Sequence, residues 1–189
     1  MKIKIGFFAV LLLLILAITS FEYFPALILS VAIHESGHIF MAKMRKIDLS
    51  ELKLGIFGAC ISPTNSLFSY TDEILLCLGG PLFNFLSVLV HVYILKLSPS
   101  SLFLLYSFSL GMLNMLPISG FDGGRIFMAI LCRFFSSITA SKISKFISFV
   151  FIFSLWSFSI YLLLKLSASL SAFVFSISMF VKIFIPDVL

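Results

Sequence analysis

Two histidines and a glutamate inside an apolar stretch constrain this chain more than any other feature. Residues 24–41, FPALILSVAIHESGHIFM, contain His34, Glu35 and His38 and no other ionisable side chain. A charged group at the centre of a membrane-spanning helix costs about 2.5–3.5 kcal/mol, so ionisable side chains persist there where they pair, line a water-filled cavity or bind an ion. The fold of this chain must therefore bring partners for these three side chains from elsewhere in the sequence.

The composition is that of an integral membrane protein. Of the 189 residues, 61% are hydrophobic and 11% are charged, whereas soluble domains carry about 25% charged residues. Hydropathy and length predict an all-α polytopic membrane protein, a single domain over residues 1–189 with about six transmembrane helices. The expected spans are residues 5–20, 24–41, 74–95, 101–117, 143–164 and 166–185. The first is short, but we expect a retained helix because no small-residue cleavage site follows it.

The basic residues predict the orientation of these spans. With the N-terminus in the cytoplasm, only Lys96 and Lys165 of the 13 lysines and arginines fall on the far side. Because cytoplasmic loops are enriched in lysine and arginine, we expect a multi-pass protein with both termini cytoplasmic. This topology explains the net charge of +5, and we expect no nucleic-acid partner.

The spacing of the two histidines predicts a metal site. Residues i and i+4 lie about 40° apart around a helix and one turn along it, so His34 and His38 present their rings on one face. Two neutral imidazoles so placed can share a zinc ion. Glu35 lies beside them, where a carboxylate can accept a proton from water, as in HExxH hydrolases. The alternative interpretation is a pair of core histidines that only hydrogen-bond within a helix bundle.

A zinc centre needs a third protein ligand, and Asp122 is the best candidate among the acidic residues. It follows the fourth span in the run 114–125, NMLPISGFDGGR. Pro117 and the glycines predict irregular backbone, which is tolerated at membrane depth where it lines a cavity or is buried in protein. His38 lies about 7.5 Å from Lys43 by helical rise, so both parts of the site converge near the cytoplasmic leaflet. Taken alone, DGGR would be an ordinary interfacial turn.

The one sizeable polar stretch lies between the second and third spans. Residues 47–54 alternate apolar and polar, which is typical of a strand with one covered face. Gly55, Gly58 and Pro63 then indicate a short β-hairpin-like, membrane-associated segment. It is either a plain surface connector or an edge strand that pairs with an extended substrate. The three cysteines are expected to be small structural hydrophobes, and His91 is expected to be an interfacial residue outside the metal site.

Three motifs together resemble those of the site-2 protease family of intramembrane zinc metalloproteases, peptidase family M50. They are HESGH at residues 34–38, GPLFN at 80–84 and the NxxP to DGG run that contains Asp122. Six spans with HExxH in the second are most similar to the stage IV sporulation protein FB group. No PDZ domain is expected within the 189 residues, which agrees with that group. Two features depart from the pattern. Ser119, Gly120 and Phe121 stand where a second proline and a leucine usually precede the aspartate, and no CBS domain, which the sporulation enzymes carry, is expected.

The resemblance implies a catalytic core over about residues 24–130 with one zinc ion per chain. The ion would be bound by His34, His38 and Asp122, and Glu35 would be the general base and later the proton donor. The implied reaction is the hydrolysis of peptide bonds of membrane-associated substrates in a bacterial cell membrane, with the active site near the cytoplasmic side. A sporulation sigma-factor precursor is one implied substrate.

Three further residues would contact or position that substrate. Asn84 would hold the substrate backbone or the developing oxyanion, its alternative role being a hydrogen bond between helices. Asn114 and Pro117 would shape the loop that presents Asp122. Expected partners are a membrane-anchored protein substrate and membrane regulatory or inhibitory proteins, and the oligomeric state stays open. Two other functions also stay open: a transition-metal carrier, which has no use for Glu35 as a base, and a non-catalytic membrane scaffold.

Overall fold

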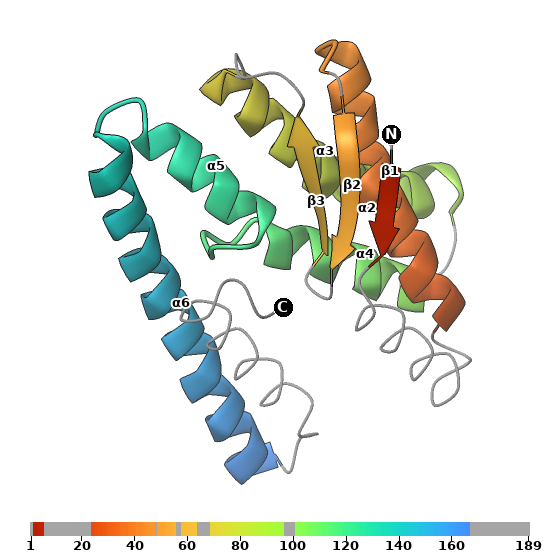
Figure 1. Cartoon of the computed structure of the whole chain (residues 1–189). Helices are drawn as coiled ribbons and strands as arrows, with labels where there is room; N and C mark the ends of the chain where they lie inside the picture. The colour runs from red at the N-terminus through yellow and green to blue at the C-terminus, as the bar shows by residue number, and fades with distance from the viewer. Residues whose placement is uncertain are drawn as a thin grey trace.

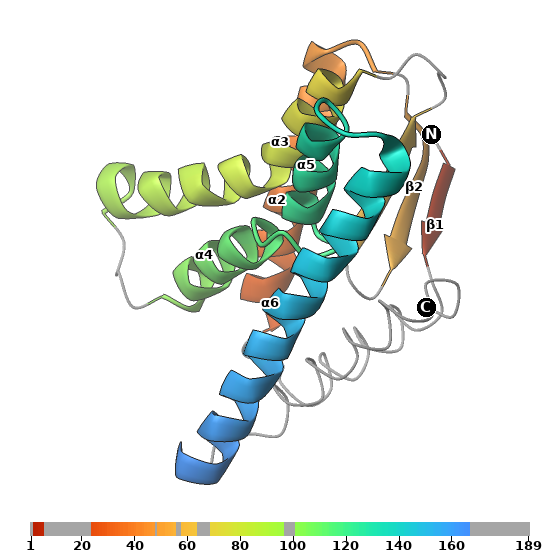
Figure 2. The same ribbon diagram turned by 90° about the vertical axis from the view of Figure 1, so that its left-hand side faces the viewer.

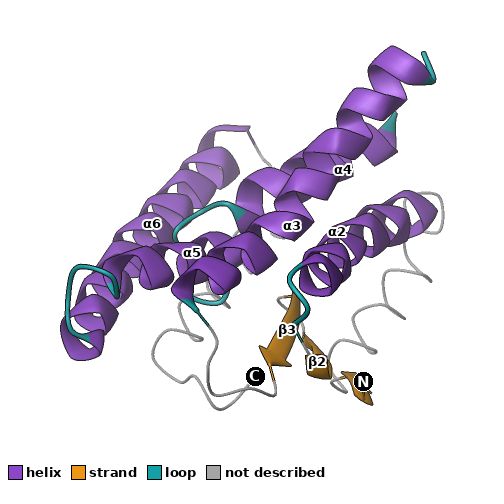
Figure 3. Cartoon of the chain, turned by 90° about the horizontal axis from the view of Figure 1, so that it is seen from above, coloured by secondary structure: helices purple, strands orange, loops and turns teal. Residues whose placement is uncertain are grey.

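The computed structural model describes residues 2–5, 24–47, 49–55, 58–63, 69–96 and 101–166 of the chain. The helices within these ranges are α2 (Phe24–Met44), α3 (Tyr70–Leu89), α4 (Leu102–Asn114), α5 (Asp122–Leu131) and α6 (Ser137–Leu166), and a π-helical turn, η1 (Val90–Ile94), continues α3. The strands are β1 (Lys2–Ile5), β2 (Leu49–Gly55) and β3 (Gly58–Pro63). The three strands form one sheet that lies to one side of the helices (Figures 1 and 3).

Helix α3 is the central helix of the described part, because it contacts α2, α4 and α5. Helix α6 lies at the periphery and contacts α5 (Figure 2). Glycines let α2 and α3 approach closely, since a Cβ at Gly37 or at Gly79 would collide with the backbone carbonyl of the other. Small residues at such crossings allow membrane helices to associate without a hydrophobic driving force.

Helix α2 is apolar on its exposed face and polar on its buried face. Leu29, Phe40 and Met44 are among its exposed side chains. Ser30, by contrast, is buried and accepts a hydrogen bond of 3.1 Å from the Ser107 hydroxyl of α4. This inside-out distribution is what a lipid environment requires, because polar groups there must be satisfied within the protein.

Within the described residues, three helices are long and apolar enough to cross a membrane. They are Phe24–Met44, Tyr70–Ile94, which joins α3 to η1, and Ser137–Tyr161 of α6. They cover the predicted spans 24–41 and 74–95 and most of 143–164. The predicted spans 5–20 and 166–185 lie almost wholly outside the described residues, so a total of six spans stays a prediction.

The segment from α4 to α5 differs from the sequence-based prediction. The fourth span was expected to reach Pro117, but α4 has 13 residues and ends at Asn114, because the residues before a proline are biased away from helix. Irregular backbone was expected through residue 125, whereas Asp122 is the first residue of the ten-residue helix α5. Two adjacent glycines masked this helix in the sequence, since glycine is a poor helix former.

Helix α6 begins earlier than predicted, at Ser137 instead of residue 143. The Ser136 hydroxyl accepts a hydrogen bond of 3.4 Å from the Thr139 backbone N–H, as an N-terminal cap does. Lys142, which precedes the predicted span, therefore lies within the helix, as Lys145 does.

The sheet has the order β1-β2-β3, with β1 parallel and β3 antiparallel to β2. Strands β2 and β3 occupy the polar stretch between α2 and α3, and their register pairs Leu52 with Ile61. The pairing of β1 with β2 joins residues almost fifty positions apart, and no sequence pattern predicted it. The association of this sheet with a membrane surface stays a prediction.

Two ion pairs connect the start of α3 to the end of α2 and to α5. Arg45, just after α2, contacts Asp72 in the first turn of α3 at 2.7 Å. Arg125 of α5 contacts Glu73, the next residue of α3, at 3.4 Å. Partly exposed pairs of this kind add little stability, but they mark one polar end of the helix group.

Candidate metal centre

Helix α2 places His34 and His38 one turn apart on its buried face. The two side chains are almost inaccessible, with the residues 5% and 4% exposed. Their ring centroids are 4.9 Å apart and the rings meet edge to face at 81°. Both Nε2 atoms point to the same spot, 3.2 Å from each other.

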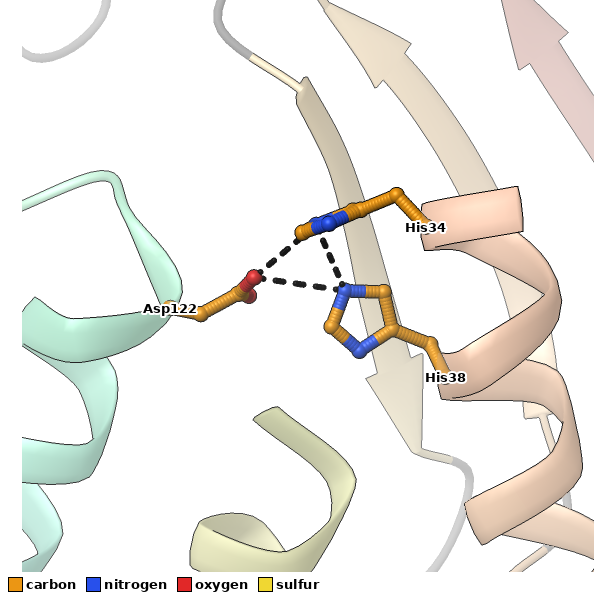
Figure 4. A group of neighbouring side chains, drawn as sticks. All are labelled: His34, His38 and Asp122. Atoms are coloured by element: carbon orange, nitrogen blue, oxygen red, sulfur yellow. Dashed lines mark hydrogen bonds and ion pairs between the residues drawn. The ribbon is translucent and has the colours of Figure 1, made fainter. Parts of the chain in front are cut away.

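Asp122 reaches the same spot from the first residue of α5 (Figure 4). Its Oδ2 atom lies 3.1 Å from His34 Nε2 and 3.3 Å from His38 Nε2, and the residue is 7% exposed. The structure therefore brings together, over a separation of 88 residues, the three side chains that the sequence suggested as ligands.

The spacing of the three donor atoms fits a tetrahedral ion. Two ligands that each lie 2.0–2.1 Å from a tetrahedral zinc ion are about 3.3 Å apart, and the three distances here are 3.1, 3.2 and 3.3 Å. Two imidazoles and a carboxylate are also a ligand set that zinc accepts, with a fourth position left for water or substrate. These residues form a possible metal-binding site.

The far side of each imidazole is held by α3. His38 Nδ1 lies 2.8 Å from the backbone carbonyl of Leu76, so it donates its proton there and leaves the Nε2 lone pair for a metal. His34 Nδ1 lies 3.3 Å from the side-chain amide of Asn84. A neutral His34 ring that binds a metal through Nε2 carries its proton on Nδ1. The Asn84 side chain must then be oriented with its oxygen toward Nδ1, so that the oxygen accepts this proton in a hydrogen bond.

Gly80 of α3 completes the wall of the centre. A Cβ at this position would lie 2.5 Å from His38 Nε2 and 2.6 Å from His34 Nε2. The space over the two donor nitrogens exists because residue 80 has no side chain. Gly80 lies in the GPLFN motif, but its contact with the histidines had no signal in the sequence. The contact of the Leu76 carbonyl with His38 had no signal either, because every residue carries a backbone carbonyl.

The remaining candidates lie around this centre. Glu35 follows His34 on α2, is half-buried and interacts electrostatically with His38. Asn84 is fully buried, and its Oδ1 has no hydrogen-bond partner among the described residues. The Asn114 side-chain amide donates a hydrogen bond of 3.0 Å to the Leu110 carbonyl within α4. Pro117 lies in the loop that precedes Asp122. Substrate contacts of these last three residues stay predictions.

The other singled-out residues lie elsewhere. His91 is buried in η1, with Nε2 3.0 Å from the hydroxyl of Ser101, the residue before α4, and it does not belong to the group of His34, His38 and Asp122. Cys77 is buried and Cys132 is half-buried, and neither forms a disulfide. The side chain of Cys60 lies outside the described residues.

Gly120 explains one departure from the family pattern. It has a φ of 101°, which proline cannot adopt because its ring fixes φ near −65°. A rigid proline at this position is therefore excluded by the path that the loop takes here.

Comparisons with known proteins agree with this architecture. The profile of peptidase family M50 matches residues 92–158, which include the Asp122 segment. A curated zinc metalloprotease of Methanocaldococcus jannaschii is 28% identical over 129 residues, which make up 64% of this chain and 38% of that protein. The chain thus spans well under half the length of this relative. The solved structure of a site-2 protease from Methanocaldococcus jannaschii has a TM-score of 0.65 and 24% identity, and the match covers 95% of this chain and 88% of that one.

The fold and the site define a multi-pass membrane protein with a buried His-His-Asp centre of the metalloprotease type. The fold is similar to that of a solved site-2 protease, and residues 92–158 match the profile of peptidase family M50. The curated relative is a zinc metalloprotease, and His34, His38 and Asp122 are the residues of this chain that could hold a zinc ion.

Proposed function

We propose that this chain is an intramembrane zinc metalloprotease that hydrolyses peptide bonds of membrane-associated proteins. The observation that carries the proposal is the convergence of three donor atoms at 3.1–3.3 Å, two of them from an HExxH motif that also supplies Glu35. When bound, zinc supplies Lewis acidity, which lowers the pKa of water to about 7 and polarises a carbonyl.

The protein's own residues supply the rest of the chemistry. Glu35 takes the proton from the attacking water and later gives it to the leaving amine, which is the two-way role of a general acid–base residue. The Asn84 side chain has two polar groups. When its oxygen accepts from His34 Nδ1, its NH2 group is available to donate to a substrate carbonyl or to the oxyanion that develops from it.

The substrate must present an accessible peptide bond to this centre. In a helix, carbonyls are engaged in i to i−4 hydrogen bonds, so a spanning helix must unwind locally before it is cut. We therefore expect substrates with helix-breaking residues or extended segments near the cleaved bond. Among the described strands, β3 has no partner on its outer edge, and such an edge is suited to hold an extended segment by strand addition.

The orientation and pathway are part of the proposal. The distribution of lysine and arginine supports cytoplasmic termini and an active site near the cytoplasmic side. The resemblance to the stage IV sporulation protein FB group supports a membrane-associated sigma-factor precursor as one substrate to test, with other membrane-anchored proteins and membrane regulators as further partners.

The test compares membrane proteomes of cells that carry wild-type protein, Glu35→Gln or Glu73→Gln. The Glu73→Gln change is the matched control, because Glu73 lies on α3 and contacts Arg125 outside the metal centre. We expect one or a few membrane proteins to accumulate uncut only with Glu35→Gln. Equal cleavage by wild type and Glu35→Gln would refute the proposed chemistry, and transition-metal uptake without any cleavage would support a carrier instead.

A further inference from the structure

The loop that precedes Asp122 contacts α6 as well as its chain neighbours α4 and α5, and this suggests how the centre is assembled. Residues 115–121 join α4 to α5 without regular structure. The last of them, Phe121, directly precedes Asp122, and the Phe121 N–H donates to Ile118 O at 3.0 Å. Any shift of this loop therefore moves the Asp122 carboxylate relative to the two histidines.

A buried hydroxyl of α6 binds the middle of the loop. Ser148 is fully buried, and its Oγ accepts a hydrogen bond of 2.9 Å from the Ser119 backbone N–H. The same Oγ lies 3.4 Å from the Pro117 carbonyl and 2.8 Å from the Ser144 carbonyl one turn earlier in α6. A single hydroxyl thus joins two loop residues to a helix about thirty positions further along the chain.

Apolar contacts reinforce this attachment. Ile152, one turn beyond Ser148, forms a buried cluster with Ile118 and Phe121 of the loop. On the α5 side the fit is tight, since a Cβ at Gly124 would collide with the Ile118 carbonyl. The loop is therefore held between α5 and one face of α6.

The middle of the loop is less enclosed than Ile118 and Phe121, which are buried. Ser119 and Gly120 are exposed and border a cavity of about 240 Å³ that Met128 of α5 and Lys145 of α6 also line. At Ser119 and Gly120 the loop therefore lacks the packing that Ile118 and Phe121 have, and residue 120 lacks the rigidity of a proline. In this exposed stretch, the hydrogen bond from the Ser119 N–H to Ser148 fixes the backbone.

We propose that Ser148 is a positioning residue of the metal centre: by binding the Ser119 N–H it sets the loop so that Asp122 meets His34 and His38. This inference rests on the proposed metal centre. Residues that orient metal ligands from outside typically change metal affinity by about 10- to 100-fold when they are replaced. The role assigned to Ser148 is indirect, and it does not touch the metal or the substrate.

The experiment measures zinc affinity by chelator competition on the purified full chain in detergent, without any activity assay. We expect Ser148→Ala to weaken zinc binding at least about 10-fold. The matched control is Ser144→Ala, which removes a buried hydroxyl from the same helix one turn away, and it should stay within about 2-fold of wild type. Ser148→Ala and Ser144→Ala should have similar melting temperatures in the zinc-free state.

A double-mutant cycle separates positioning from a general effect on the fold. In an Asp122→Ala background, Ser148→Ala should change zinc affinity less than about 2-fold, because the ligand on which it acts is gone. An undiminished effect in that background would overturn the inference, as would wild-type affinity in Ser148→Ala. A wild-type protein that binds no zinc would instead refute the metal centre itself, and the positioning role with it.

Discussion

The substitution Gly80→Ala tests the metal centre most directly, because it adds one methyl group at a place where the structure has no room. The new Cβ would lie 2.5 Å from His38 Nε2, 2.6 Å from His34 Nε2 and 2.7 Å from His34 Cε1. Favourable contacts between such atoms begin near 3.5 Å, so the rings or α3 must move by about 1 Å. Ligand distances in metal sites vary by only about 0.2 Å.

The expected result is a loss of zinc affinity without a loss of folding. A displacement of about 1 Å exceeds the tolerance of the site several-fold, so we expect zinc binding to weaken by at least about 100-fold. Alanine is also the better helix former, by roughly 0.5–1 kcal/mol, which offsets part of the strain in the zinc-free protein. Zinc affinity by chelator competition and the melting temperature with excess chelator give the two readouts.

The matched control is Gly111→Ala in α4. Its Cβ would meet the Phe85 ring at 3.0–3.1 Å and the Asn84 Cβ at 3.4 Å. These are contacts with side chains, and neither donor nitrogen is among the three nearest atoms. We expect wild-type zinc affinity in this variant. If Gly80→Ala also kept wild-type zinc affinity, the arrangement of α3 against the two histidines would be wrong.

Three other outcomes are expected. Glu35→Gln should keep zinc at wild-type affinity and lower the cleavage rate at least about 100-fold, so loss of the metal in this variant would assign Glu35 to the ligand set. Asp122→Ala should weaken zinc binding strongly while its control, Asp72→Ala, does not, because Asp72 pairs with Arg45 outside the centre; equal affinities would exclude Asp122 as a ligand. Arg45→Met should change the free energy of unfolding by no more than about 1 kcal/mol, because the Arg45 side chain is 42% exposed. A larger loss in a chemical unfolding experiment would show that the pair of Arg45 and Asp72 contributes more to stability than an exposed ion pair does.

The sequence predicted the helical spans best where apolar runs are long. Helix α2 matches the predicted start at residue 24 and extends three residues beyond the predicted end. Helix α5 was missed because it has ten residues, too few for a span, and begins with Asp122 and two glycines. The parallel pairing of β1 with β2 was also missed, since a four-residue strand depends on a partner that is distant in the chain.

The convergence of His34, His38 and Asp122 was easier to predict than the fold around them. A helix has a fixed period, so HExxH already places His34 and His38 on one face, and the scarcity of acidic residues leaves few choices for a third ligand. The supporting groups had weaker signals or none. The Leu76 carbonyl and the Ser119 N–H are backbone atoms that every residue carries, and Ser148 is one serine among many in α6.

The sequence by itself determined that this chain enters a membrane and that α2 carries two imidazoles one turn apart. It also determined that these imidazoles and Glu35 need partners from elsewhere in the chain. These properties follow from composition and helical periodicity, which are local. The tertiary structure alone decided that Asp122 meets both histidines at 3.1–3.3 Å, that Gly80 leaves the space between them and that Ser148 holds the Asp122 loop. Such distances depend on how α2, α3, α5 and α6 lie against one another, and no local pattern specifies the relative placement of helices.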